Sequence, residues 1–517
     1  MNEKKQPTAR KLSIVSSIAG GIVFVFLLSA AAFGQALPTA PGLQLQTFIR
    51  IPTWITSNAV GPTANVASFD EPAFNRVTGV MYIADRPNKG VLAIDTKTWT
   101  FIGSVELPGC RVNSVCSPSG ALVAPDLQKL IITDRDTHIF VYDLRAPGLS
   151  PPVVLSGPPG QDELDYDPIN QRAYIGNTTG PEFFITVIDL KNDNVLGFIP
   201  LSDPPEQPRF NPVDGLIYVS VPARGIVIID PERGAFGQVI NGFAPPSTCP
   251  NSVRAIDVDP TTNTAYVGCS TGPQSVVDLR NGAVLQSIPI TGEDIAFFNP
   301  HNRRWYLAAD NRTALPGVTI PCPKGSDGRT GVLGVISNAP TQAQFQGVAC
   351  VGRGAARTGI DTINNNIYVP IVQYPADPNS ADTGSPGVLV FHDTAPDVFG
   401  VPAGTVQSVS QATLATVSGS GISGTVTFTL RRRNIFVDAG LNGLPGGNTS
   451  TLLVVTTAAG NETINCGVNA AGAGFCQGTL QGDPMVGGVV AVGSDGRRVA
   501  SGTINSVATF PTFIPTD

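Results

Sequence analysis

The chain has 517 residues, with 32 Lys and Arg against 39 Asp and Glu, which gives a formal net charge of −7. This mildly acidic balance argues against a nucleic-acid partner, because neutralising phosphates requires clustered Lys and Arg. Its one basic run, Arg431 to Arg433, is interpreted as a solvated strand end. Few charged residues (14%) with 56 Gly and 45 Pro are typical of an all-β protein, and the length predicts more than one domain.

Residues 1–36 have the pattern of an export signal. Basic residues precede an apolar run from Ile14 to Ala32, and small residues follow it up to Ala36. This order predicts a secretory leader cleaved near Ala36. An uncleaved anchor is the alternative, because the run approaches the ~20 residues that span a bilayer. The remaining chain is then expected to be secreted, periplasmic or at the cell surface, with no membrane contact beyond the leader.

Eight cysteines in an exported chain predict disulfide bonds. They fall into sequence neighbours, although spacing alone leaves the connectivity open. The neighbours are Cys110 and Cys116, Cys249 and Cys269, Cys322 and Cys350, and Cys466 and Cys476.

One short strand motif recurs seven times. Its copies are MYIAD (81–85), LIITD (130–134), AYIGN (173–177), IYVSV (217–221), AYVGC (265–269), WYLAA (305–309) and IYVPI (367–371). In five copies a proline stands six residues before the second residue of the motif, and this proline marks a tight turn. These prolines are Pro125, Pro168, Pro212, Pro260 and Pro300.

A third strand follows each copy, as in VLAID (91–95) and IVIID (226–230), and a fourth follows in TFIGSVELP (100–108). Four short strands repeated seven times predict a seven-bladed β-propeller over residues 43–400. The inner strands are near-continuous apolar runs, because both faces of each blade are covered by neighbouring blades.

The seventh repeat lacks a fourth strand after residue 396. The stretch LQTFIRIP, Leu45 to Pro52, resembles residues 100–108 and has no partner strand beside it. We therefore predict that this N-terminal strand completes the seventh blade and closes the ring, which would otherwise expose a blade face and an unpaired edge. A stray edge strand is the alternative.

Strands such as IYVPI and AYVGC ahead of a VIDL-type strand resemble the YVTN-type bacterial propellers over residues 45–396. This resemblance implies the fold and little about function, because such propellers have many roles. The chain departs from the pattern at Ile131, which replaces the tyrosine, and in insertions at 310–330 and 372–386.

Residues 403–517 have a different residue pattern, in which apolar and small polar residues alternate between Gly-rich turns. This pattern predicts a β-sandwich that resembles bacterial immunoglobulin-like modules, in which Cys466 and Cys476 would staple one hairpin. The resemblance implies a domain that presents or spaces its neighbour.

Function is expected on one face of the propeller. The six propeller cysteines and both insertions lie in connections that share this face, and loops on a rigid scaffold are where binding usually resides. Aligning the repeats on the proline column places one residue of each innermost strand at the channel mouth on this face. The ring is Asp70, Ser119, Asp162, Glu206, Arg254, Asp294 and Ala356.

The charged members of this ring are the candidate ligand-binding residues: Asp70, Asp162, Glu206, Arg254 and Asp294. Converging carboxylates can hold a cation, which makes Asp70, Asp162 and Asp294 candidate metal ligands and calcium the candidate cofactor. The alternative is that the ring is solvated, with Arg254 paired to Glu206 or Asp294.

Three histidines, His138, His301 and His392, do not form a zinc- or copper-type cluster in the predicted fold, and no catalytic residue is identified. A binding protein for a protein or an envelope polysaccharide is therefore the leading hypothesis. Its rivals are a metal-dependent hydrolase or lyase at the acidic mouth and a structural surface-layer component. The oligomeric state is left open.

Overall fold

The computed structural model of the chain describes residues 36–51, 68–395, 409–444 and 451–503, apart from internal gaps. The gaps are 87, 111–115, 146–150, 213, 248, 261, 301, 311–314, 325–328, 339–342, 353, 373–385, 417–422, 432–433, 458–459, 469–473, 481–487 and 493–497. The predicted leader, apart from Ala36, lies outside the described residues, as do His301 and the boundary predicted near 400. No helix within the described ranges is long and apolar enough to cross a membrane.

Seven four-stranded antiparallel sheets form the blades of a propeller, which confirms the predicted fold. Blade 1 is β2 (Phe69–Asn75), β3 (Val80–Asp85), β4 (Gly90–Asp95) and β5 (Thr100–Glu106). Blade 2 is β6 (Pro118–Ala124), β7 (Lys129–Asp134), β8 (His138–Asp143) and β9 (Val153–Ser156). Blade 3 is β10 (Gln161–Asp167), β11 (Arg172–Asn177), β12 (Phe183–Asp189) and β13 (Asn194–Leu201). Blade 4 is β14 (Pro208–Phe210), β15 (Ile217–Val221), β16 (Gly225–Asp230) and β17 (Gln238–Phe243).

The remaining blades follow the same order, and the last takes one strand from the other end of the chain. Blade 5 is β18 (Val253–Asp259), β19 (Thr264–Cys269), β20 (Gln274–Asp278) and β21 (Val284–Ile288). Blade 6 is β22 (Glu293–Asn299), β23 (Arg304–Ala309), β24 (Val332–Asn338) and β25 (Ala343–Cys350). Blade 7 is β26 (Gly359–Asp361), β27 (Asn366–Ile371), β28 (Gly387–Asp393) and β1 (Leu43–Arg50).

The seven turns between the first and second strand of each blade have a residue with positive φ at the same repeat position. These residues are Gly79 (73°), Gln128 (50°), Gln171 (53°), Gly215 (73°), Asn263 (54°), Arg303 (54°) and Asn365 (54°). Five of these residues are not glycine and adopt a conformation that costs L-residues about 1–2 kcal/mol. The same turn in every repeat therefore sets the same register for the tyrosine-bearing strand, which is why a fixed proline spacing predicts the blades.

Apolar clusters lie between neighbouring blades and hold them face to face. One cluster joins Val388 and Val390 of blade 7 to Met81 and Ile83 of blade 1, and all four are fully buried. Strands β15 and β19 are buried along their whole length, as the near-continuous apolar runs predict.

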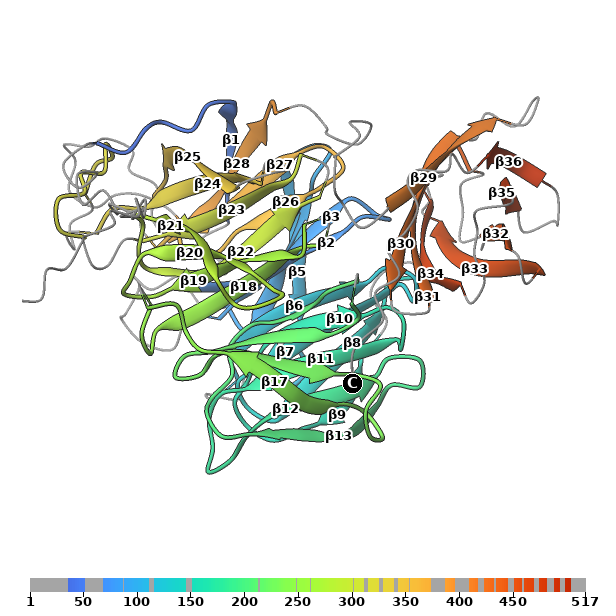
Figure 1. Cartoon of the computed structure of the whole chain (residues 1–517), viewed down its shortest axis with the longest axis horizontal. Helices are drawn as coiled ribbons and strands as arrows, with labels where there is room; N and C mark the ends of the chain where they lie inside the picture. The colour runs from blue at the N-terminus through green and yellow to red at the C-terminus, as the bar shows by residue number, and fades with distance from the viewer. Residues whose placement is uncertain are drawn as a thin grey trace, which may run out of the picture.

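Strand β1 closes the ring by pairing antiparallel with β28, from Leu43 opposite Asp393 to Arg50 opposite Gly387. Figure 1 shows the blue β1 beside the orange β28, although more than 300 residues of chain separate them. The residues just before β1 also dock on blade 6, where the Ala40 N–H donates to the Val348 carbonyl at 3.0 Å. The predicted closure is confirmed.

The C-terminal strands are β29 (Val409–Thr416), β30 (Ser423–Arg431), β31 (Asn434–Asn442), β32 (Thr451–Thr457), β33 (Gly460–Val468), β34 (Gly474–Leu480), β35 (Gly488–Val492) and β36 (Arg498–Thr503). They pair in one closed order, β29-β30-β31-β34-β33-β32-β35-β36. The two separate sheets of the predicted sandwich are not confirmed, because β32 pairs with both β33 and β35 and β29 with both β30 and β36. Cys466 and Cys476 face each other across β33 and β34 and form the predicted disulfide.

Ring closure gives a direct test with a matched control on one strand. Ile49 is buried between blades 7 and 1, whereas Leu45 on the same strand is 48% exposed. We expect Ile49→Ala to lower the free energy of unfolding by about 2–5 kcal/mol and Leu45→Ala by less than about 0.5 kcal/mol. Denaturant unfolding of the full chain measures both, and equal effects of the two changes would contradict the closure model.

Candidate functional site

Three disulfides lie on one face of the propeller, as the neighbour pairing predicts. Cys110–Cys116 lies in the connection between blades 1 and 2, and Cys249–Cys269 joins the connection entering blade 5 to the end of β19. Cys322–Cys350 joins the insertion between β23 and β24 to the end of β25. The Cα atoms of these pairs are 5.3, 5.7 and 5.4 Å apart. We call this side, where the innermost strands begin, the stapled face.

A β-bulge recurs at the start of the innermost strand in five blades. Pairing shifts by one residue between Phe69 and Pro72, Pro118 and Gly120, Gln161 and Leu164, Val253 and Ile256, and Glu293 and Ala296. A regular strand sends consecutive side chains to opposite faces, whereas a bulge re-aims them. Asp162 and Glu163 are consecutive, and one oxygen of each lies within 4.8 Å of the other and of an oxygen of Glu206.

The predicted mouth ring is brought together, but it is not solvated. Asp70 is fully buried, Asp162 is 1% exposed and Glu206 is 9% exposed. The side chains of Asp294 and Arg254 remain 26% and 38% exposed, so the mouth opens on their side. Arg254 pairs with Glu206, one of the two partners proposed for it.

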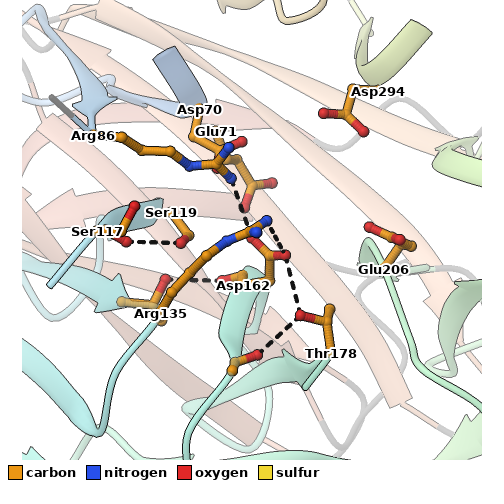
Figure 2. A network of polar contacts seen from close by, with 12 residues as sticks. Asp70, Glu71, Arg86, Ser117, Ser119, Arg135, Asp162, Thr178, Glu206 and Asp294 are labelled. Carbon is orange, nitrogen blue, oxygen red and sulfur yellow. Dashed lines mark hydrogen bonds and ion pairs between the residues drawn. The ribbon is translucent and has the colours of Figure 1, made fainter. Parts of the chain in front are cut away.

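Three further arginines enter the mouth and neutralise its aspartates. Arg86 contacts Asp70 and approaches Asp162 at 3.7 Å, and Arg135 Nη2 donates to Asp162 Oδ2 at 2.7 Å. Arg357 Nε donates to Asp70 Oδ1 at 3.2 Å, and its Nη2 contacts Asp294. Figure 2 shows Arg86 and Arg135 reaching toward Asp162 from one side, with Glu206 and Asp294 on the other.

Sequence reasoning missed these arginines, although the repeat carried a signal for two of them. Arg86 and Arg135 occupy the same repeat position, directly after the aspartate that ends MYIAD and LIITD, and Thr178 follows AYIGN in the same way. Thr178 Oγ1 also lies 3.4 Å from Asp162 Oδ2. These three residues stand at the same position of the repeat, one residue beyond the five-residue strand motif, so an alignment that includes this position predicts them. No such repeat position marks Arg357.

Below the mouth, Arg209 of β14 crosses the channel and joins opposite blades. It is 5% exposed, and its Nη2 donates to Glu71 Oε1 of blade 1 at 2.9 Å. Its Nε lies 3.6 Å from Asp257 of blade 5, and its guanidinium lies 4.8 Å above the Phe297 ring of blade 6. Burial raises the pKa of Glu71 to about 7, although Arg209 opposes the shift. We call Arg209, Glu71, Asp257 and Phe297 the channel plug.

Carboxylates near the axis also satisfy backbone groups of other blades. An innermost strand leaves one edge unpaired toward the channel, and buried N–H groups require acceptors. The N–H of Leu164 donates to Glu71 Oε2 at 2.9 Å, and that of Phe210 donates to Asp165 Oδ2 at 2.6 Å. Part of the acidic character of the channel therefore has a structural purpose.

Two sets of three carboxylate side chains at the mouth have the spacing of metal ligands. One oxygen from each of Asp70, Glu163 and Asp294 lies within 4.8 Å of the others, and the same holds for Asp162, Glu163 and Glu206. The predicted metal ligands Asp70, Asp162 and Asp294 are each paired with arginine, so a metal would have to compete with guanidinium groups. Glu163, which the sequence analysis omitted, is common to both groups.

A third group with metal-like spacing, Asp134, Asp136 and His138, lies in the turn before β8. Asp134 accepts the N–H groups of Asp136 and His138 at 3.1 and 3.0 Å and lies 3.2 Å from His138 Nδ1. This carboxylate therefore caps its own turn, and the group is explained by local structure.

No protein-family model matches the chain, and no curated protein matches it.

Replacing Arg209, the cation of the channel plug, is expected to lower the free energy of unfolding strongly. Arg209→Met leaves Glu71 and Asp257 buried without their shared partner, which we expect to cost about 3–5 kcal/mol of stability. Arg233→Met is the control, because Arg233 is 63% exposed and pairs with Asp230 at 3.4 Å; its cost should stay below about 1 kcal/mol. Denaturant unfolding compares them, and adding Glu71→Met to Arg209→Met should restore part of the loss.

Burial of Glu71 also predicts that the free energy of unfolding depends on pH. Because the pKa of Glu71 rises from 4.5 to about 7 on folding, the folded chain retains this proton to higher pH. The contribution of Glu71 to stability is therefore present below pH 4.5 and is lost as the pH rises to 7. Glu71→Gln should make the stability–pH slope less negative in this window by up to about 1.4 kcal/mol per pH unit. The exposed Glu182→Gln is the control, and an unchanged slope in Glu71→Gln would show that Glu71 does not titrate there.

Proposed function

We propose that this chain is an exported binding protein that recognises its ligand at the channel mouth on the stapled face. The observation that carries this proposal is the convergence of three aspartates and four arginines at one end of the channel, where Asp70 and Asp162 are buried and Arg135 and Arg254 remain partly exposed. The channel plug lies across the axis beneath them, which favours binding at the mouth over passage through it. Desolvating ion pairs is costly, so such a cluster is more readily understood as a recognition site than as a stabilising device.

The disulfides support export in this proposal. Four disulfides within the described residues fit an oxidising compartment, such as the periplasm or the extracellular space. They also tie three loop regions around the mouth to the scaffold, which reduces the entropy lost when a ligand binds. We further propose that the propeller is of the YVTN type, that residues 403–517 are an immunoglobulin-like spacer, and that the partner is a protein or an envelope polysaccharide.

A metal-dependent hydrolase or lyase is the second candidate. The two sets of three carboxylate side chains that have Glu163 in common favour it. Calcium would be the metal, bound by Asp70, Asp162 and Asp294 with Glu163. The arginines paired with the three aspartates disfavour it, because a divalent ion beside them would leave the mouth with one excess positive charge. Calcium titration of the full chain, with and without a chelator, separates the two candidates.

The binding proposal is tested by reversing one charge on each side of the propeller. Arg254 lies at the mouth and pairs with Glu206, whereas Arg233 lies in a turn on the opposite side and pairs with Asp230. We expect Arg254→Glu to weaken binding to purified envelope polysaccharides and envelope proteins by about tenfold or more, with Arg233→Glu within about twofold of wild type. Sedimentation with defined envelope fractions measures this. Equal binding by both variants and wild type would place recognition away from the mouth.

A further inference from the structure

Glu163 is the acidic side chain at the mouth without an ion-pair partner among the described residues. It lies in the bulge of β10, is 3% exposed, and its Oε2 is buried with no hydrogen-bond donor. A buried carboxylate oxygen without a donor is costly, and native structures avoid it unless a ligand or proton occupies the place. Burial, with the carboxylates of Asp162, Asp294 and Glu71 nearby, raises the pKa of Glu163 well above its usual range.

The charges at the mouth are unbalanced by one. Among the side chains that the structure describes there, the carboxylates are Asp70, Asp162, Glu163, Glu206 and Asp294. The facing cations are Arg86, Arg135, Arg254 and Arg357. Every carboxylate except Glu163 has an arginine within ion-pair distance, so ionising Glu163 leaves one negative charge uncompensated. A ligand with one positive charge would balance it.

The spacing of the oxygens fits an ammonium group. One oxygen from each of Asp162, Glu163 and Glu206 lies within 4.8 Å of the other two. An ammonium nitrogen about 2.8 Å from tetrahedrally placed acceptors sets those acceptors about 4.6 Å apart. A primary ammonium has three N–H donors and no acceptor, which matches three carboxylate oxygens. A divalent ion would leave the mouth with one excess positive charge beside four arginines.

We propose that the mouth binds the primary ammonium group of a ligand on Glu163, with Asp162 and Glu206 as the other acceptors. This inference rests on the proposed binding function and names the chemical class of its ligand. A lysine side chain and an amino sugar both supply this group, and both are present in envelope proteins and polysaccharides.

Isothermal titration calorimetry of the full chain tests this inference. The probes are Nα-acetyl-lysine amide and glucosamine, and their matched neutral forms are Nα,Nε-diacetyl-lysine amide and N-acetylglucosamine. We expect at least one amine to bind and its acetylated form not to bind.

Glu163→Gln is the informative variant, because glutamine has nearly the shape of glutamate without its charge. It should weaken amine binding by about tenfold or more. Glu182→Gln, an exposed change in the same blade, should leave amine binding unchanged. Amine selectivity in the wild type tests the inference even if the variant folds poorly.

The outcomes separate this inference from the function on which it rests. Arg254-dependent envelope binding that is insensitive to amines and to Glu163→Gln would overturn the ammonium site and leave the binding function intact. Loss of both would overturn the binding function as well. Calcium binding that competes with the amines and is removed by a chelator would overturn the ammonium site in favour of the enzyme candidate, and equal occupancy by sodium would overturn it as an unselective cation site.

Discussion

Closure of the ring by β1 is the constraint on which the rest of this structure depends. Each blade buries both faces against its neighbours, so the chain needs a seventh joint to leave no face open. Pairing of β1 with β28 completes that joint and buries Ile49 against Met81. The same joint carries part of the mouth, because Arg357 enters from blade 7 and contacts Asp70 of blade 1. The candidate site therefore exists only in the closed ring.

The polar channel follows from the same closure. Seven innermost strands present unpaired backbone edges to one axis, and those edges need acceptors that apolar side chains do not supply. Carboxylates of Glu71 and Asp165 fill that need for Leu164 and Phe210, and Arg209 then offsets their charge. Stability comes mainly from the apolar faces between blades, since buried ion pairs cost desolvation. The polar residues instead set the charge of the channel and its mouth.

Much of the site was predictable, and the misses have identifiable physical reasons. The proline column located Asp70, Asp162 and Glu206 at the mouth because an identical turn fixes the register of every blade. Glu163 was missed because a regular strand would point it away from Asp162, and a bulge does not show in the residue pattern. Arg357 was missed because it lies in a connection whose path is set by the neighbouring blades.

The sequence by itself determined the seven-fold repeat, the strand that closes it, and the face on which the propeller cysteines lie, although it left their pairing open. These features depend on local spacing, which a linear pattern records. Only the tertiary structure decided that Asp70 and Asp162 are buried, that arginines neutralise them, and that Glu163 has no ion-pair partner among the described residues. Burial and charge balance depend on which blades meet across the axis, such as Arg209 of blade 4 with Glu71 of blade 1. No stretch of one blade contains that information, because the partners lie 138 residues apart in the chain.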